Sequence, residues 1–166
     1  DSEDAHYYWK FLIILGCFYI LPSIQFVLFQ LSDDNAICYY NYKCKKDFYF
    51  IPAFNNVVSN ILYVLLGLIF IIIVKVYDKS YNDGISYLGI NNNPSSYYCL
   101  GISLFFEGLC SATYHICPSV LNFQFDTTFM FIGCFLMVIT IYQKRHSIPT
   151  AMKFYSFCAL LIFINT

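Results

Sequence analysis

The sequence predicts an all-α, multi-pass transmembrane bundle with about five spanning helices. Of its 166 residues, 59% are hydrophobic and only 11% are charged, whereas a soluble domain usually carries about a quarter charged residues. Unpaired backbone groups are too costly in lipid, so each continuous apolar run is expected to be helical. The runs form a single transmembrane domain over residues 1–166, with predicted helices at 9–31, 54–77, 97–116, 123–142 and 150–166.

The chain does not begin with Met, and its last apolar run stops at Thr166. We therefore expect a piece of a longer protein. The first predicted helix contains Pro22, where a kink is expected. The fourth follows the third after a short turn, so these two helices should be antiparallel neighbours.

The distribution of Lys and Arg predicts the orientation, because cytosolic loops carry more of both. The side with the N-terminus carries Lys10, Lys75, Lys79, Lys144 and Arg145. The opposite side carries Lys43, Lys45 and Lys46, diluted by Asp33, Asp34 and Asp47. We predict a cytosolic N-terminus and an extracellular or lumenal loop at 32–52.

Cysteines in that loop point to a disulfide, because disulfides persist in oxidising compartments. Cys38 and Cys44 are close enough in sequence to close a small loop, and Cys117 on the same side is an alternative partner. The other five cysteines are expected to act as small buried apolar residues.

The strongest functional signal is a polar stripe in the third predicted helix. Glu107, Ser111 and His115 are spaced i, i+4, i+8 and share one helical face. Pro118 ends this helix, and Asp126 lies at the start of the next one. Polar residues of the second helix reach the same leaflet and are candidates for polar support: Asn56, Ser59 and Asn60. Ionisable residues in spanning helices usually partner one another or serve function.

Each of these residues also has a structural interpretation. His115, taken alone, is consistent with a histidine at the membrane interface that has no functional role. Asp126 is consistent with an acid that stabilises the positive end of a helix dipole at the helix N-terminus. Asn56, Ser59 and Asn60 fit hydrogen bonds between helices. An imidazole beside a carboxylate also suits zinc, but a catalytic zinc needs about three protein ligands. A metal-free Ser–His–Asp relay is less suitable, because Ser111 and His115 lie one turn apart on one helix.

Five stretches carry a resemblance to a known family: ICYYNYKC, AFNNVVSNILYVLLGL, EGLCSATYHICP, NFQFDTTFM and IYQKRH. They cover Cys38 to His146, about two thirds of the chain, and resemble the SID (systemic RNA interference defective) transmembrane family. The resemblance implies double-stranded RNA uptake and, in some members, cholesterol transport. It also implies further spanning helices and a large extracellular domain, which would be the more plausible place for RNA contact.

That family is similar to a wider group of membrane hydrolases that includes alkaline ceramidases and adiponectin receptors. Ser111, His115 and Asp126 match the first part of the group's pattern, Ser-x3-His followed eleven residues later by Asp. The resemblance implies His115 as a zinc ligand, Asp126 as an acid that ligates the metal or polarises its water, and Ser111 as a nearby hydroxyl. The distal His-x3-His pair of the pattern does not occur in this chain, so the ligand set is incomplete.

Two functions follow as hypotheses. The first is uptake of double-stranded RNA, with cholesterol as a further cargo, across the plasma or endolysosomal membrane. The second is zinc-dependent hydrolysis of a lipid amide or ester. The net charge of −1 provides no global basic field for RNA. The basic and aromatic residues of loop 32–52 better fit a solvated loop than an RNA site. Membrane lipid is an expected partner, and a homodimer is an expected assembly.

Overall fold

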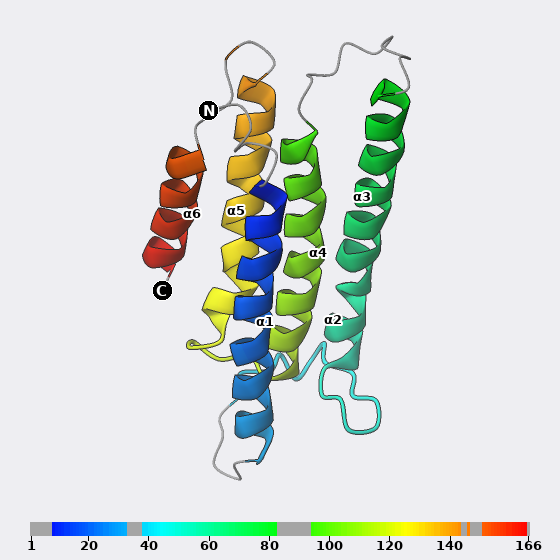
Figure 1. The fold of residues 1–166 in the computed structure, drawn as a ribbon. Helices are drawn as coiled ribbons and strands as arrows, with labels where there is room; N and C mark the ends of the chain where they lie inside the picture. Colours follow the sequence, from blue (N-terminus) through cyan, green and yellow to red (C-terminus); the bar gives the residue numbers. More distant parts are fainter. Residues whose placement is uncertain (1–7, 33–37, 83–93, 144–145, 147–150, 166) are drawn as a thin grey trace.

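The computed structural model describes residues 8–32, 38–82, 94–143, 146 and 151–165, and Figure 1 shows a bundle of helices. Within these residues the helices are α1 (Tyr8–Ser32), α2 (Phe54–Ser59), α3 (Ile61–Asn82), α4 (Ser95–Ile116), α5 (Phe123–Tyr142) and α6 (Ala151–Asn165). In the described part of the chain, four stretches are long and apolar enough to cross a membrane, with α2 and α3 counted as one, and α6 is a shorter apolar helix. The all-α, multi-pass class is therefore confirmed. Lys144, Arg145 and the loop segment 33–37 lie outside the described residues.

Helix α4 lies at the centre of the bundle and packs against α1, α3 and α5. Its buried face joins a core that also includes residues of α5 and α6. The Phe106 ring of α4 stacks on Phe129 of α5, with 5.5 Å between ring centroids. The core residues are Tyr8, Leu12, Cys99, Ile102, Phe106, Cys110, Phe129, Ile132, Leu136, Ile139, Phe154 and Cys158.

Two of the cysteines predicted to be buried are exposed on the bundle surface. Cys17 of α1 and Cys134 of α5 lie on helix faces that point away from the neighbouring helices. Cys99, Cys110 and Cys158 are buried, as predicted. The prediction failed for the first two because a thiol is apolar enough for either environment, so its presence in a span does not indicate which face it occupies.

Glycines allow α3 and α4 to approach closely. A Cβ atom at Gly67 would lie 2.6 Å from the Phe105 nitrogen and 2.8 Å from the Gly101 oxygen. A Cβ atom at Gly108 would lie 2.8 Å from the Val64 nitrogen. These neighbours are backbone atoms and cannot move aside as a side chain would. Small residues at such crossings are a common basis of helix association in membranes.

The second predicted helix is divided at Asn60 into α2 and α3, and α3 extends to Asn82. The Asn60 N–H donates to the Val57 carbonyl at 3.2 Å, and its side-chain amide donates to the Asn56 carbonyl at 3.0 Å. The predicted helix therefore contains a one-residue interruption at Asn60, while Phe54–Lys79 still forms a single apolar span. An Asn side chain that bonds to nearby backbone competes with regular helical bonding.

Candidate functional site

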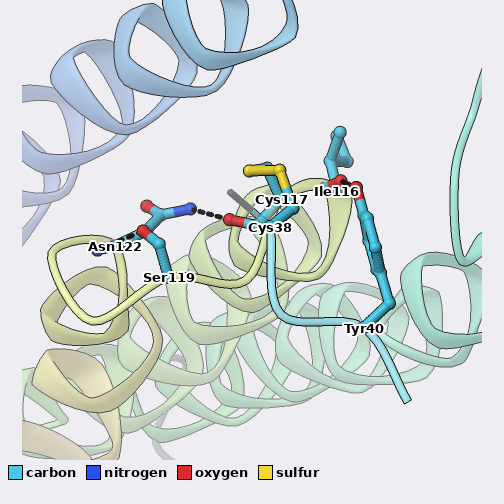
Figure 2. The surroundings of a disulfide bond; sticks show 6 residues. All are labelled: Cys38, Tyr40, Ile116, Cys117, Ser119 and Asn122. Atoms are coloured by element: carbon cyan, nitrogen blue, oxygen red, sulfur yellow. Dashed lines mark hydrogen bonds between the residues drawn. A yellow bond between two sulfur atoms is a disulfide. The ribbon is translucent and has the colours of Figure 1, made fainter. Parts of the chain in front are cut away.

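The loop that precedes α2 is fastened to the end of α4 by a disulfide between Cys38 and Cys117 (Figure 2). Of the two pairings that the sequence left open, the structure contains the one with Cys117. Cys44 is a free, exposed cysteine, so the small Cys38–Cys44 loop does not form. The disulfide joins residues 79 positions apart and thereby fixes the loop beside the α4–α5 turn.

Hydrogen bonds next to the disulfide satisfy backbone groups at the end of α4. The Tyr40 hydroxyl donates to the carbonyl oxygen of Ile116 at 2.5 Å, and the Tyr39 N–H donates to the Pro118 oxygen at 2.8 Å. In the turn, the Asn122 amide donates to the Cys117 oxygen at 3.3 Å (Figure 2). The last carbonyls of a helix have no partner within the helix, so these contacts stabilise the end at which His115 lies.

The predicted stripe lies on α4, but its residues have different surroundings. Ser111 is buried, while Glu107 and His115 are partly exposed. The Glu107 carboxyl interacts with the Met130 backbone N–H of α5 and lies within electrostatic range of Asp126. Its Oε2 atom is buried without a hydrogen-bond partner. The structure therefore brings the two acids of the α4–α5 hairpin near each other.

His115 and Asp126 are not directly bonded, and both are described residues. No hydrogen bond or ion pair joins them. The His115 ring lies beside the Tyr114 ring, with 5.2 Å between centroids. Asp126 lies within electrostatic range of Tyr114. Both predicted metal-binding residues therefore lie near Tyr114.

The described residues do not by themselves make a metal site. Among them, no group of three or more His, Cys, Asp and Glu side chains could hold a metal ion. His115 and Asp126 supply two donors of suitable chemistry, whereas zinc in a catalytic site takes about three from the protein. We therefore assign no chemical step to a metal.

The three residues predicted as polar support bond mainly within their own segment. The Ser59 hydroxyl donates to the Asn56 carbonyl at 2.7 Å, and Asn60 donates to the same oxygen at 3.0 Å. The Asn56 side chain accepts from Asn55 at 3.0 Å. Among the described residues, these bonds stabilise the turn between α2 and α3, and none of them reaches the α4 stripe.

Other polar contacts between helices were not predicted, although their sequence signal was a polar residue inside an apolar run. Ser23 of α1 is hydrogen-bonded to Thr113 of α4, and Ser96 of α4 donates to Gln143, the residue that follows α5, at 2.7 Å. Asn165 of α6 donates to Thr128 of α5 at 2.7 Å. Such bonds contribute roughly 0.6 kcal/mol each in membrane proteins, so they align helices more than they drive association.

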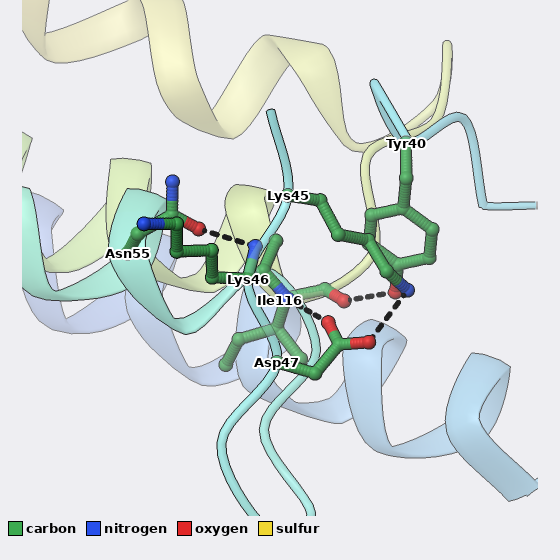
Figure 3. A network of polar contacts seen from close by, with 7 residues as sticks. Tyr40, Lys45, Lys46, Asp47, Asn55 and Ile116 are labelled. Carbon is green, nitrogen blue, oxygen red and sulfur yellow. Dashed lines mark hydrogen bonds and ion pairs between the residues drawn. The ribbon is translucent and has the colours of Figure 1, made fainter. Parts of the chain in front are cut away.

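The basic–aromatic part of the loop is internally paired (Figure 3). The Lys45 ammonium lies 4.3 Å from the Tyr40 ring centroid and 3.1 Å from an Asp47 carboxylate oxygen. Burial, followed by the charge of Asp47, raises the pKa of Tyr40. The Ala53 backbone N–H, followed by Lys45, lowers the pKa of Asp47. The charge of Lys45 is thus already matched within the loop.

A pocket of about 280 Å³ lies beside the disulfide-anchored turn. Its lining is mainly apolar and aromatic. The lining residues come from the loop before α2, the end of α4, the α4–α5 turn and the start of α5. Its lining residues are Tyr39, Tyr114, Pro118, Ser119, Val120 and Phe123.

Together these features define a multi-pass helical membrane protein with a disulfide-anchored loop at one end of its bundle. All of residues 1–166 match the family model described as "dsRNA-gated channel SID-1", and the chain therefore belongs to the SID-1 family. It is 35% identical over 170 residues to SID1 transmembrane family member 1 of Homo sapiens, covering 95% of this chain and 20% of the relative.

Other relatives extend the comparison. SID1 transmembrane family member 1 of Mus musculus is 34% identical over 171 residues, covering 96% of this chain and 21% of the relative. Cholesterol uptake protein 1 of Caenorhabditis elegans is 29% identical over 165 residues, covering 92% of this chain and 22% of the relative. The chain thus spans about a fifth of the length of the curated relatives it matches.

Proposed function

We propose that this chain forms part of the membrane bundle of a protein that takes up double-stranded RNA, with cholesterol as a further cargo. The family match over all of residues 1–166 carries this proposal. The relative from Caenorhabditis elegans named cholesterol uptake protein 1 supports the second cargo. We propose the plasma or endolysosomal membrane as its location, and RNA contact through parts of the protein beyond this chain.

The proposed orientation places the N-terminus in the cytosol. It is supported by the disulfide between Cys38 and Cys117, because such bonds persist on the extracellular or lumenal side of a membrane. The described residues Lys10, Lys75 and Lys79 lie toward the opposite end of the bundle. With Lys144 and Arg145, which the sequence assigns to the same side, five basic residues oppose the three of the loop, in agreement with the positive-inside rule.

The test uses the full-length protein expressed in cells that do not take up double-stranded RNA. Labelled double-stranded RNA should enter expressing cells, while single-stranded RNA of the same length serves as the matched control. Labelled cholesterol is measured in parallel. Absence of RNA uptake by cells with confirmed surface expression would contradict the main proposal, while loss of cholesterol uptake alone would remove only the second cargo.

The zinc site and the hydrolase function stay predictions, and no comparison favours them. They are tested in the full-length protein by combining His115→Ala with Asp126→Asn. A zinc site that uses these residues predicts lower zinc content and loss of lipid hydrolysis in the double variant. Unchanged zinc content would reject the assignment, and unchanged RNA uptake would show that transport is independent of these residues.

A further inference from the structure

The loop between α1 and α2 ends in an exposed aromatic turn. This turn, which we call the aromatic tip, comprises Phe48–Ile51 and is closed by two backbone hydrogen bonds between Phe48 and Ile51, of 3.2 and 3.0 Å. Tyr49 and Phe50 are each 88% exposed. Two neighbouring aromatic rings in this state are unusual for a surface that contacts only water.

The fold holds these two rings outward. Tyr49 has a φ of 52°, a left-handed conformation that a bulky residue seldom adopts. The Phe48 ring packs against Phe54, the first residue of α2, with 4.9 Å between centroids. Asp47 accepts a hydrogen bond from Ala53 at 2.8 Å across the base of the tip. The tip is therefore an ordered turn. Phe48 holds it against α2, and the rings of Tyr49 and Phe50 are exposed.

The position of the tip matches a membrane interface. It directly precedes α2 and lies at the same end of the bundle as the last turns of α1 (Figure 1). Those last turns expose Leu28, Phe29 and Leu31, which are 62%, 67% and 49% exposed. Apolar residues so exposed on a spanning helix indicate that lipid reaches their level. The aromatic tip lies at this end of the bundle and is therefore near the boundary between the hydrocarbon core and the lipid headgroups.

We propose that the aromatic tip is an interfacial anchor that inserts Tyr49 and Phe50 into the headgroup region of the surrounding bilayer. Tyr and Trp are enriched at this depth, because their rings combine an apolar body with a polar tip, and Phe50 adds an apolar ring beside Tyr49. Lys43 and Lys46 of the same loop are exposed and available to lipid phosphates. The occupant is bilayer lipid, and the proposal does not depend on the cargo that the protein transports.

The test places the photoreactive residue benzoylphenylalanine at Phe50 in the full-length protein, in bilayers of phosphatidylcholine. Two matched positions on α5 serve as controls: Phe131 is 48% exposed and Phe129 is 1% exposed. After irradiation, mass spectrometry separates lipid adducts from protein adducts. Position 50 should give mainly lipid adducts, as position 131 should, while position 129 should give protein adducts.

Two results would overturn the proposal. Adducts of position 50 only with protein would show that the tip docks on another part of the protein or on a partner. Absence of adducts at position 50, with position 131 still labelling lipid, would place the tip in water. Cooperative thermal unfolding of all three variants in detergent confirms that the comparison involves folded protein, although overpacking at the buried position 129 should lower its melting temperature.

Discussion

Helices α3 and α4 differ in hydrophobicity and in burial, and the more hydrophobic of the two is the less buried. The α2–α3 span is the most apolar of the four candidate spans in the described residues, but only 17% of its apolar 18-residue stretch is buried. Helix α4 is the least apolar of the four, and 50% of its corresponding stretch is buried. The buried face of α4 includes Gly101, Ser103, Gly108 and Ser111. In lipid, small and polar residues therefore mark the interior better than apolar residues do.

The largest expected difference between α3 and α4 is in the stability lost when one large side chain of each helix is replaced by alanine. Phe106→Ala in α4 removes a 6% exposed ring that stacks on Phe129 and should destabilise the protein by about 3–5 kcal/mol through the cavity left behind. Ile72→Ala in α3 removes a 60% exposed side chain and should change stability by less than about 0.5 kcal/mol. Chemical unfolding of the full-length protein in detergent measures both. Similar losses would contradict the different burial of the two helices.

The next effect concerns the anchored end of α4. Cys38→Ser removes a disulfide between residues 79 positions apart and should cost about 2–5 kcal/mol, because the unfolded chain regains conformational freedom. Cys44→Ser is the matched control, since Cys44 is a free cysteine in the same loop, and it should leave stability unchanged. Thermal unfolding without reductant compares the two variants. A larger loss for Cys44→Ser would indicate that the disulfide pairing differs.

A smaller effect is expected where the two helices meet. Gly67→Ala places a Cβ 2.6 Å from the Phe105 backbone nitrogen and should destabilise by about 1–3 kcal/mol through overpacking. Gly133→Ala is the control, because its Cβ would meet only the Ser103 hydroxyl at 3.1 Å. The denaturant midpoints of unfolding of the two variants are compared with that of the unmodified protein. Tolerance of alanine at position 67 would mean that α3 and α4 lie farther apart.

The smallest effect is the pH dependence of the loop outside the spans. The pKa of Asp47 is lowered by the Ala53 N–H and then by Lys45. The stabilisation is therefore present above the unfolded carboxyl pKa of about 4 and is lost as the pH falls through the lower folded value. Amide exchange at Ala53, corrected for intrinsic rates, should show this loss of protection in acid.

Two variants sharpen the pH prediction. Asp47→Ala removes the acceptor of the Ala53 N–H, so amide exchange at Ala53 should be faster at neutral pH. The protection of Ala53 should then show no further loss when the pH is lowered into the acid range. Lys43→Ala changes an exposed charge of the same loop and should leave that exchange unaltered. Full protection of Ala53 in Asp47→Ala would show that the carboxylate does not hold the base of the tip.

Much of the fold was predictable from sequence, because continuous apolar runs in lipid leave few alternatives to helices. The predicted limits of the span at Phe123–Tyr142 coincide with α5. The one-residue interruption at Asn60 within the second predicted helix depends on a bond of the Asn60 side chain to the Asn56 carbonyl, which hydrophobicity along the sequence does not show.

The candidate site was less predictable. Helical spacing placed Ser111 and His115 on one face, and the hairpin followed from the short turn. Spacing does not determine how α4 and α5 rotate about their axes, so it did not predict that Tyr114 lies beside the His115 ring and within electrostatic range of Asp126. The sequence likewise left two disulfide pairings open, because the choice depends on where the loop meets the end of α4.

The account is tested most directly by labelling the full-length protein in bilayers with a lipid-soluble carbene reagent, followed by mass mapping of α3 and α4. Ile102 and Phe106, which are 5% and 6% exposed, should stay unlabelled, whereas Leu66 and Ile72 of α3, which are 54% and 60% exposed, should be modified. Labelling of Ile102 and Phe106 as heavy as that of the α3 residues would contradict the central position of α4.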